Sequence, residues 1–265
     1  MDAIKLFFAF TKVSFLTQLE YPARYLVRAF GKILSFGGGF ALLAIMLTRF
    51  GAIGTWSMYE VLLLYSVNIL CYSIGATFAM PVCNLSVRVR NGLIDYILTK
   101  PVNSMYLYVC QQVSAGYTTN YIISLFIMGV SLYNLDIGVT AFSVVYLVLS
   151  IIGGSLIHAA ALIASGVPAF WLVKSHALSN IFYWEATRFI DYPINIYAGG
   201  VQFILTFLIP YAFINYYPVQ LFLGRADTPF SSILTYLTPL VGVICFFLAY
   251  RFWEFGLNAY QSTGS

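Results

Sequence analysis

Residues 146–164 have the sequence YLVLSIIGGSLIHAAALIA, and this stretch decides the class of fold. It is apolar on all sides apart from small hydroxyl groups and His158, so it lacks the two-residue alternation of a half-buried strand. A membrane-spanning β-strand would need segments of about ten residues with that alternation. A helix crosses a bilayer with about 20 mostly apolar residues. The stretch therefore predicts a transmembrane helix.

The rest of the chain has the same character. Of its 265 residues, 61% are hydrophobic and only 8% are charged, whereas soluble domains carry about 25% charged residues. We therefore predict an all-α integral membrane fold in which residues 1–265 form a single transmembrane domain of about six helices with short loops. The predicted spans cover about 31–50, 60–86, 104–133, 141–172, 198–214 and 230–251.

The positions of the basic residues predict the orientation of these spans. An even number of spans places both termini on one side, and basic residues concentrate on the cytoplasmic side. If the N-terminus is cytoplasmic, only Arg49 and Arg225 of the 13 basic residues lie outside. Both termini are therefore predicted to be cytoplasmic. The basic residues expected on that side are Lys5, Lys12, Arg24, Arg28, Lys32, Arg88, Arg90, Lys100, Lys174, Arg188 and Arg251.

Residues 1–22 predict an amphipathic helix that lies in the membrane interface. Asp2, Lys5, Lys12 and Glu20 share one sector of a helix, and aromatic and aliphatic residues occupy most of the remainder. Pro22 ends or kinks this helix. The solvated face of an ordinary helix end is the alternative.

The loop after the second span, RVRNGLIDYILTKPVNS at 88–104, predicts a short surface helix. Asn91 can cap its start, Asp95 lies in its first turn, Lys100 lies near its end and Pro101 stops it, as capping and the helix dipole favour. Such a helix can dock in a groove of a soluble partner, and an ordinary interfacial helix is the alternative. Its expected apolar face consists of Leu93, Ile94, Ile97 and Leu98.

The loop at 174–197, KSHALSNIFYWEATRFIDYPINIY, is predicted to lie on the cytoplasmic side. It combines aromatic residues with Glu185, Arg188 and Asp191, which favours an amphipathic helix on the inner membrane surface, broken at Pro193. This loop is a second candidate for contact with a partner.

The segment after the fifth span, IPYAFINYYPVQLFLG at 209–224, combines prolines with a polar and aromatic patch. Tyrosines are common at the membrane interface, so a plain aromatic belt is one interpretation. Irregular backbone at membrane depth is tolerated where it is buried in protein or lines a wet cavity. The second interpretation is therefore a re-entrant segment that forms an outer gate from Asn215, Tyr216, Tyr217 and Pro218.

Groups that could carry chemistry inside the membrane are scarce. His158 is the clear intramembrane ionisable residue, and a hydrogen-bonded packing role and a proton relay are both open. The chain has no HExxH motif, no paired intramembrane carboxylates and no GxxxxGK[ST] phosphate loop. The cysteines lack the short paired spacing of a metal site. If the protein transports a substrate, a separate ATPase is the simplest source of energy.

Four segments of the chain match a known family when they are taken together: RNGLIDYILTKPVN (90–103), DYPINIY (191–197), IPYAFINYYPVQLFLG (209–224) and GLNAYQSTGS (256–265). Over nearly its full length the chain resembles the membrane subunits of type 2 ABC exporters, the ABC-2 permease family. More narrowly, it resembles the branch of uncharacterised six-span permeases that are paired with a second permease and one ATPase.

This resemblance implies a subunit of the bacterial-type plasma membrane that forms half of a translocation pathway. It implies ABC ATPase subunits that bind ATP and Mg, a second permease that is identical or a sister chain, and surrounding membrane lipids. No cofactor bound by this chain and no nucleic acid partner are expected. The residues expected to couple to the ATPase are Arg88, Arg90, Asn91, Gly92, Asp95, Lys100 and Pro101. A second cytoplasmic contact is expected at Arg188, Asp191 and Pro193.

Two other classes of function stay open at this point. A stand-alone secondary carrier or channel would transport without an ATPase and could use His158. A membrane enzyme or assembly factor would need a catalytic constellation that the sequence does not contain.

Overall fold

The computed structural model describes residues 5, 9–13, 16, 20, 22–50, 52–113, 115–135, 137–138, 140–172, 176–225, 227 and 231–260. Within these residues the chain is helical except for turns, connecting segments and one two-stranded hairpin. Most of the predicted interfacial helix over 1–22, as well as Lys174 and the last residues of the chain, lie outside the described residues.

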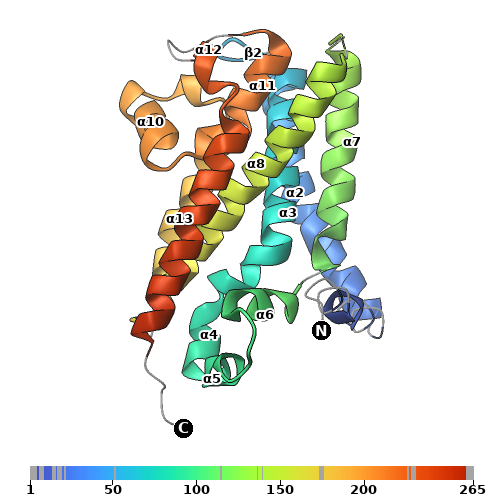
Figure 1. Ribbon diagram of the computed structural model, residues 1–265. Coiled ribbons are helices and arrows are strands. Elements are labelled where there is room, and N and C mark those ends of the chain that lie inside the picture. The colour runs from blue at the N-terminus through green and yellow to red at the C-terminus, as the bar shows by residue number, and fades with distance from the viewer. Residues whose placement is uncertain are drawn as a thin grey trace.

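Long helices that run alternately up and down form the body of the molecule (Figure 1). The hairpin of β1 (Ala52–Ile53) and β2 (Trp56–Ser57) joins the first two of them at one end, which we call the hairpin end. The opposite end carries the short helix α5 (Leu93–Leu98), and we call it the α5 end. The long helices are α2 (Pro22–Phe50), α3 (Met58–Cys83), α7 (Thr118–Asn134), α8 (Ala141–Gly166) and α13 (Thr238–Ala259).

Helix α8 is the central helix, and it packs along α3 on one side and α13 on the other. The thiol of Cys71 in α3 lies 3.6 Å from the carbonyl oxygen of Ile151 in α8. On the other side, a Cβ atom at Gly153 would lie only 2.6 Å from the carbonyl oxygen of Thr238. A glycine at this crossing lets the two backbones come into direct contact, as small residues do between membrane helices.

Three helical stretches of the described chain are long and apolar enough to cross a membrane: Met58–Arg90, Ala141–Phe170 and Thr238–Ala259. The first includes α3 and α4, and the second includes α8 and the 3-10 turn η2 (Val167–Phe170). They correspond to the predicted spans at 60–86, 141–172 and 230–251, although the last begins eight residues later than predicted. The predicted span 31–50 lies within α2, in which Ala29–Leu42 is a shorter apolar stretch.

The structure divides the predicted span 104–133 into two helices. Helix α6 (Ser104–Cys110) lies roughly across the bundle at the α5 end, and α7 then rises alongside α2 and α3 (Figure 1). The polar residues between them, including Gln111 and Gln112, interrupt the helix before the turn η1 (Ala115–Tyr117). The apolar character of 104–133 is continuous enough to suggest one helix, but these polar residues mark the break.

The segment 176–191 runs back along α8 as a helical run, so its described part packs against the long helices and is not the separate loop predicted for 174–197. The hydroxyl of Ser179 donates to the carbonyl oxygen of Ser165, and Tyr183 faces His158 further along. Residue numbers rise from Ser179 to Tyr183 in this segment while those of their partners in α8 fall from Ser165 to His158, so the two segments are antiparallel. This helical run consists of α9 (His176–Ser179), the π-helix η3 (Asn180–Glu185) and the 3-10 helix η4 (Arg188–Asp191).

The predicted span 198–214 is instead the first arm of a helical segment that runs partway along the edge of the bundle, where Phe203, Phe207 and Leu208 are exposed, and then turns back. Gly199–Leu208 has ten helical residues, which measure about 15 Å along the axis, half the thickness of a bilayer core. We call residues 199–223 the re-entrant segment. After the 3-10 turn η5 (Ile194–Ile196), it consists of α10 (Gly199–Phe203), η6 (Ile204–Leu208), η7 (Tyr211–Phe213) and α11 (Tyr216–Leu223). The short helix α12 (Ser231–Leu234) then leads to α13.

Candidate functional site

The α5 end carries the residues that the sequence singles out for contact with a partner. Helix α4 (Leu85–Arg90) continues beyond α3, and the chain then turns at Asn91 and Gly92 into α5. Figure 1 shows α4 and α5 projecting beyond the ends of the long helices. Gly92 caps α5 at its N-terminal end with a φ of 65°, a left-handed conformation that glycine adopts without strain. The capping role predicted for Asn91 therefore belongs to Gly92, and Asn91 ends α4 instead.

Helix α5 presents an apolar face outward as well as inward. Ile94 and Ile97 are buried in the core beside Leu85 and Val89. Leu93 and Leu98 are each 44% exposed, so the prediction that all four apolar residues share one face is wrong. Residues three apart share a face of a helix. Ile94 and Ile97 therefore lie on the buried face, and Leu93 and Leu98 lie on the exposed one. With Tyr96, the exposed leucines form an apolar surface.

Basic side chains border this apolar surface. The ammonium nitrogen of Lys100 lies 4.6 Å from the ring centroid of Tyr96, and the guanidinium of Arg88 lies 5.9 Å from that of Tyr108. Cations over aromatic rings are held by the ring quadrupole. Arg90 is exposed at the end of α4, and Pro101 is exposed beyond α5.

Asp95 is half-buried in the first turn of α5, where the helix dipole favours a carboxylate. The structure therefore brings all seven predicted coupling residues into one elbow. We call this elbow, residues 88–101, the α5 surface. A projecting helix with exposed leucines, an exposed tyrosine and basic neighbours can seat in a groove on another protein.

The second predicted contact does not lie at this end. The amide nitrogen of Asn68 in α3 donates to Asp191 over 2.9 Å, and Pro193 is buried just beyond. Arg188 is exposed on the helical run 176–191, where it pairs with Glu185 over 3.5 Å. The run climbs toward the hairpin end, so it carries these three residues away from the α5 surface.

The predicted gate residues lie in the core, in the part of the re-entrant segment that returns toward the hairpin end. The amide nitrogen of Asn215 donates to the carbonyl oxygens of Leu64, over 3.2 Å, and Ile190, over 2.7 Å. The hydroxyl of Tyr217 lies 2.9 Å from that of Thr206, which links the two arms of the segment. All four predicted residues, Asn215, Tyr216, Tyr217 and Pro218, are buried.

An ion pair that the sequence analysis missed holds the returning arm at the hairpin end. Glu60 at the start of α3 lies 2.9 Å from Arg225, which follows α11. Arg225 also donates to the carbonyl oxygen of Thr55 over 2.9 Å, and the indole of Trp56 donates to Asp227 over 3.1 Å. The partners are about 170 residues apart in sequence, so no local pattern could have indicated them.

His158 is the centre of a chain of hydrogen bonds between three helical elements. A carboxylate only accepts, so Asp191 orients the Asn68 amide with its nitrogen toward the carboxylate. The Asn68 oxygen then accepts from His158 Nε2 over 3.1 Å, and His158 Nδ1 accepts from the hydroxyl of Tyr183 over 3.0 Å. We call these four residues the polar chain. His158 and Asp191 stand out in the sequence, but their grouping with Asn68 and Tyr183 has no local sequence signal.

The polar chain satisfies His158 in its neutral form, with one nitrogen donating and the other accepting. The amide of Asn68 separates the imidazole from the carboxylate, and an amide nitrogen does not release a proton to pass it on. The polar chain is therefore a packing network between α3, α8 and the run 176–191. In the described part of the molecule, no group of three or more His, Cys, Asp or Glu residues could hold a metal ion.

Comparison with known protein families gives a match over most of the chain. A family model described as ABC-2 family transporter protein matches residues 33–264. No curated protein and no solved structure matches the chain.

Proposed function

The chain belongs to the ABC-2 family of transporter proteins, and from this premise we propose that it is the permease subunit of an ATP-driven ABC exporter that works with a separate ATPase. Membership makes it a multi-pass membrane component of an ABC transporter that is not itself catalytic. The match over 33–264 is the observation that carries the proposal.

The α5 surface is the proposed docking site for the ATPase. The chain contains no phosphate loop, so ATP and Mg would be bound by the partner. Exposed Leu93, Tyr96 and Leu98 would enter a groove on the ATPase, and Arg90 would contact its rim. Ile94 and Ile97 anchor α5 in the core, so a movement of α5 would be transmitted to α3 and α8.

In the proposed orientation the α5 end faces the cytoplasm of a bacterial-type plasma membrane. Arg88, Arg90, Lys100 and Arg251 lie at this end, in keeping with the positive-inside rule. Arg188 no longer supports this orientation, because the run 176–191 carries it toward the other end. The six crossings would be α2, α3, α7, α8, the run 176–191 and α13, with both termini cytoplasmic.

The proposal includes a second permease, either an identical copy or a sister chain. Helix α2 lies at the periphery, and its exposed apolar residues include Leu26, Val27, Phe30 and Leu34. A face of this kind suits a neighbouring membrane helix. The pathway would run between the two permeases, and outward transport follows from the exporter class.

Charge reversal on the α5 surface tests the docking proposal. Arg90→Glu should weaken recovery of the ATPase with the permease and uncouple ATP hydrolysis from transport, because an exposed rim charge would face its partner with the wrong sign. Arg188→Glu is the matched control, since it reverses an exposed arginine away from the α5 surface. ATPase recovery should be normal with Arg188→Glu. Normal recovery and coupling with Arg90→Glu would contradict the docking site.

A stand-alone carrier or channel is the alternative. A proton-driven carrier would need a titrating group that relays protons, and the polar chain is interrupted by the Asn68 amide between His158 and Asp191. This geometry favours the ATP-driven proposal.

A further inference from the structure

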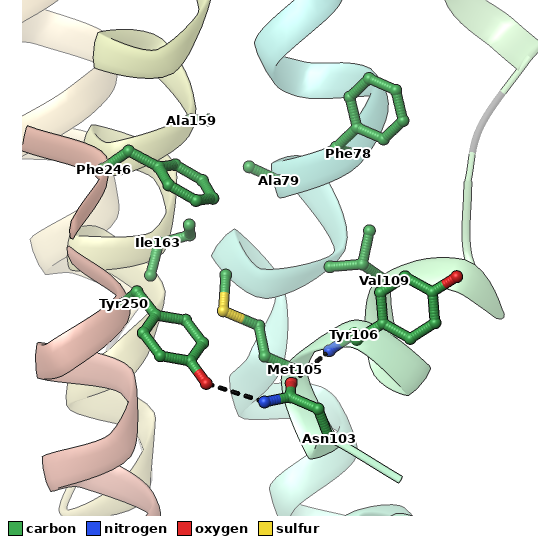
Figure 2. Close-up of a pocket in the computed structure, with 10 residues that line it drawn as sticks. All are labelled: Phe78, Ala79, Asn103, Met105, Tyr106, Val109, Ala159, Ile163, Phe246 and Tyr250. Carbon is green, nitrogen blue, oxygen red and sulfur yellow. Dashed lines mark hydrogen bonds between the residues drawn. The ribbon is translucent and has the colours of Figure 1, made fainter. Parts of the chain in front are cut away.

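A cavity of about 360 Å³ opens between α3, α6, α8 and α13 near the α5 end. Figure 2 shows Phe246 and Tyr250 extending from α13 toward Ala79 of α3 and Met105 of α6. Most of its lining is aliphatic or aromatic. Phe78 at its edge is 40% exposed, so the cavity is open toward the surroundings of the helices.

The foot of this cavity is polar. The Asn103 side chain donates to the Tyr250 hydroxyl over 2.7 Å, and its oxygen accepts from the backbone nitrogen of Tyr106 over 2.9 Å (Figure 2). Asn103 thereby caps α6 and fixes the Tyr250 hydroxyl at the end of the apolar wall. A hydroxyl that accepts one hydrogen bond can still donate its own proton.

A second, largely polar cavity of about 460 Å³ adjoins the first and shares Asn103 and Tyr250 with it. Ser104, Arg251, Trp253 and the acidic residue Glu254 also line this second cavity. The guanidinium of Arg251 lies 2.9 Å from Glu254 and is 66% exposed, and the indole nitrogen of Trp253 lies 3.5 Å from the Ser104 hydroxyl. The two cavities together have an apolar compartment and a polar one, joined at Asn103 and Tyr250.

The position of this junction along α13 coincides with the edge of the apolar part of the helix. The outward-facing residues before it, Val243, Ile244 and Phe247, are apolar and exposed, whereas Arg251 and Glu254, the charged residues of the helix, follow it together with exposed Phe255. Charged residues of a membrane helix lie at or beyond the interface, and tryptophan is enriched there. The apolar cavity therefore lies at acyl-chain depth and the polar cavity at headgroup depth.

We propose that these joined cavities bind one glycerophospholipid of the leaflet at the α5 end, with an acyl chain between Phe78, Met105 and Phe246 and the headgroup beside Tyr250 and Arg251. The apolar cavity excludes polar ligands because its walls offer few hydrogen-bond partners. The Tyr250 hydroxyl donates to an ester or phosphate oxygen, and Arg251 attracts the phosphate. This inference depends on the membrane embedding of the chain and not on the proposed ATPase partner.

Photolabelling in defined vesicles tests the site. The chain, with any subunits that copurify, is reconstituted with phosphatidylglycerol that carries a photoreactive diazirine in one acyl chain, and labelled peptides are identified by mass spectrometry. Labels should concentrate on 103–109 and 246–250. Val109→Trp, which fills the apolar cavity, should abolish this concentrated labelling, whereas Phe247→Trp on the exposed side of α13 should leave it unchanged.

A second variant tests the headgroup contact without altering the apolar wall of the cavity. Tyr250→Phe keeps the ring but removes the hydroxyl, and with it the proposed bond to the lipid and the bond from Asn103, so labelling by phosphatidylglycerol should fall by about 2- to 10-fold. A diacylglycerol probe, which lacks the phosphate, should label the wild-type chain weakly. Labels spread evenly over the exposed face of α13, or equal labelling by diacylglycerol and phosphatidylglycerol, would overturn the proposal.

Discussion

His158 is satisfied by its neighbours and does not need to titrate. Its two nitrogens contact Asn68 and Tyr183, and the histidine is 1% exposed. Loss of its side chain would take this hydrogen bond from the Asn68 side-chain oxygen and from the Tyr183 hydroxyl in a buried environment, and each orphaned group costs about 1–3 kcal/mol. The residue is thus important for stability.

Two substitutions of His158 separate stability from proton chemistry. His158→Gln keeps a donor and an acceptor but cannot titrate, and ATP-driven transport in reconstituted vesicles should largely survive. His158→Ala orphans two groups and should lower the free energy of unfolding by about 2–6 kcal/mol, measured as a lower thermal midpoint in detergent. Loss of transport in a well-folded His158→Gln variant would instead support a proton-coupled carrier.

Among the helices and loops, the apolar content of the sequence led to a wrong prediction for two segments, the helical run 176–191 and the re-entrant segment. The run contains Glu185, Arg188 and Asp191, so it has the composition of a loop. In the structure Glu185 and Arg188 form an exposed pair within the run, and Asp191 accepts from Asn68 of α3, so one local and one tertiary contact satisfy these charges. Gly199–Leu208 is more apolar but too short to cross. Helices α3 and α8 were predictable because their apolar residues are continuous.

The α5 surface was predictable in part from the sequence. Its helix, its acidic first turn and its terminating Pro101 follow from local rules of capping and charge. The burial of Ile94 and Ile97, and not of Leu93 and Leu98, depends on the packing of α5 against α4, and the sequence carries no local signal for that. The ion pair of Glu60 with Arg225 likewise depends on tertiary structure.

The returning arm of the re-entrant segment should depend on Asn215. Asn215→Leu removes the donor to Leu64 and Ile190 and leaves two buried carbonyl oxygens without it, so it should destabilise the fold by about 1–3 kcal/mol. Thermal unfolding in detergent measures the effect. Asn134→Leu is the matched control, because the exposed Asn134 side chain bonds only to a carbonyl of its own helix. Equal stability of the two variants would contradict the role of Asn215.

The helical run 176–191 leads from the α5 end of the molecule to the hairpin end, so in the proposed topology its C-terminal end lies on the opposite side of the membrane from α5. Ala198 is exposed near the hairpin end, and Thr99 is exposed at the α5 end. In a chain with Cys245→Ser, an impermeant maleimide should label Ala198→Cys in intact cells and Thr99→Cys only after permeabilisation. The remaining cysteines, Cys71, Cys83 and Cys110, are buried. Labelling of Ala198→Cys only after permeabilisation would place this segment on the cytoplasmic side and contradict the proposed crossing of the run 176–191.

We propose that this permease works with a separate ATPase, and purification from the native host would reveal such a partner. The tagged chain would be isolated in mild detergent, and its partners would be identified by mass spectrometry. We predict recovery of an ATPase that carries a phosphate loop, together with a second permease if the pair is not a homodimer. Recovery of the chain alone, under conditions that preserve known transporter complexes, would contradict the claim.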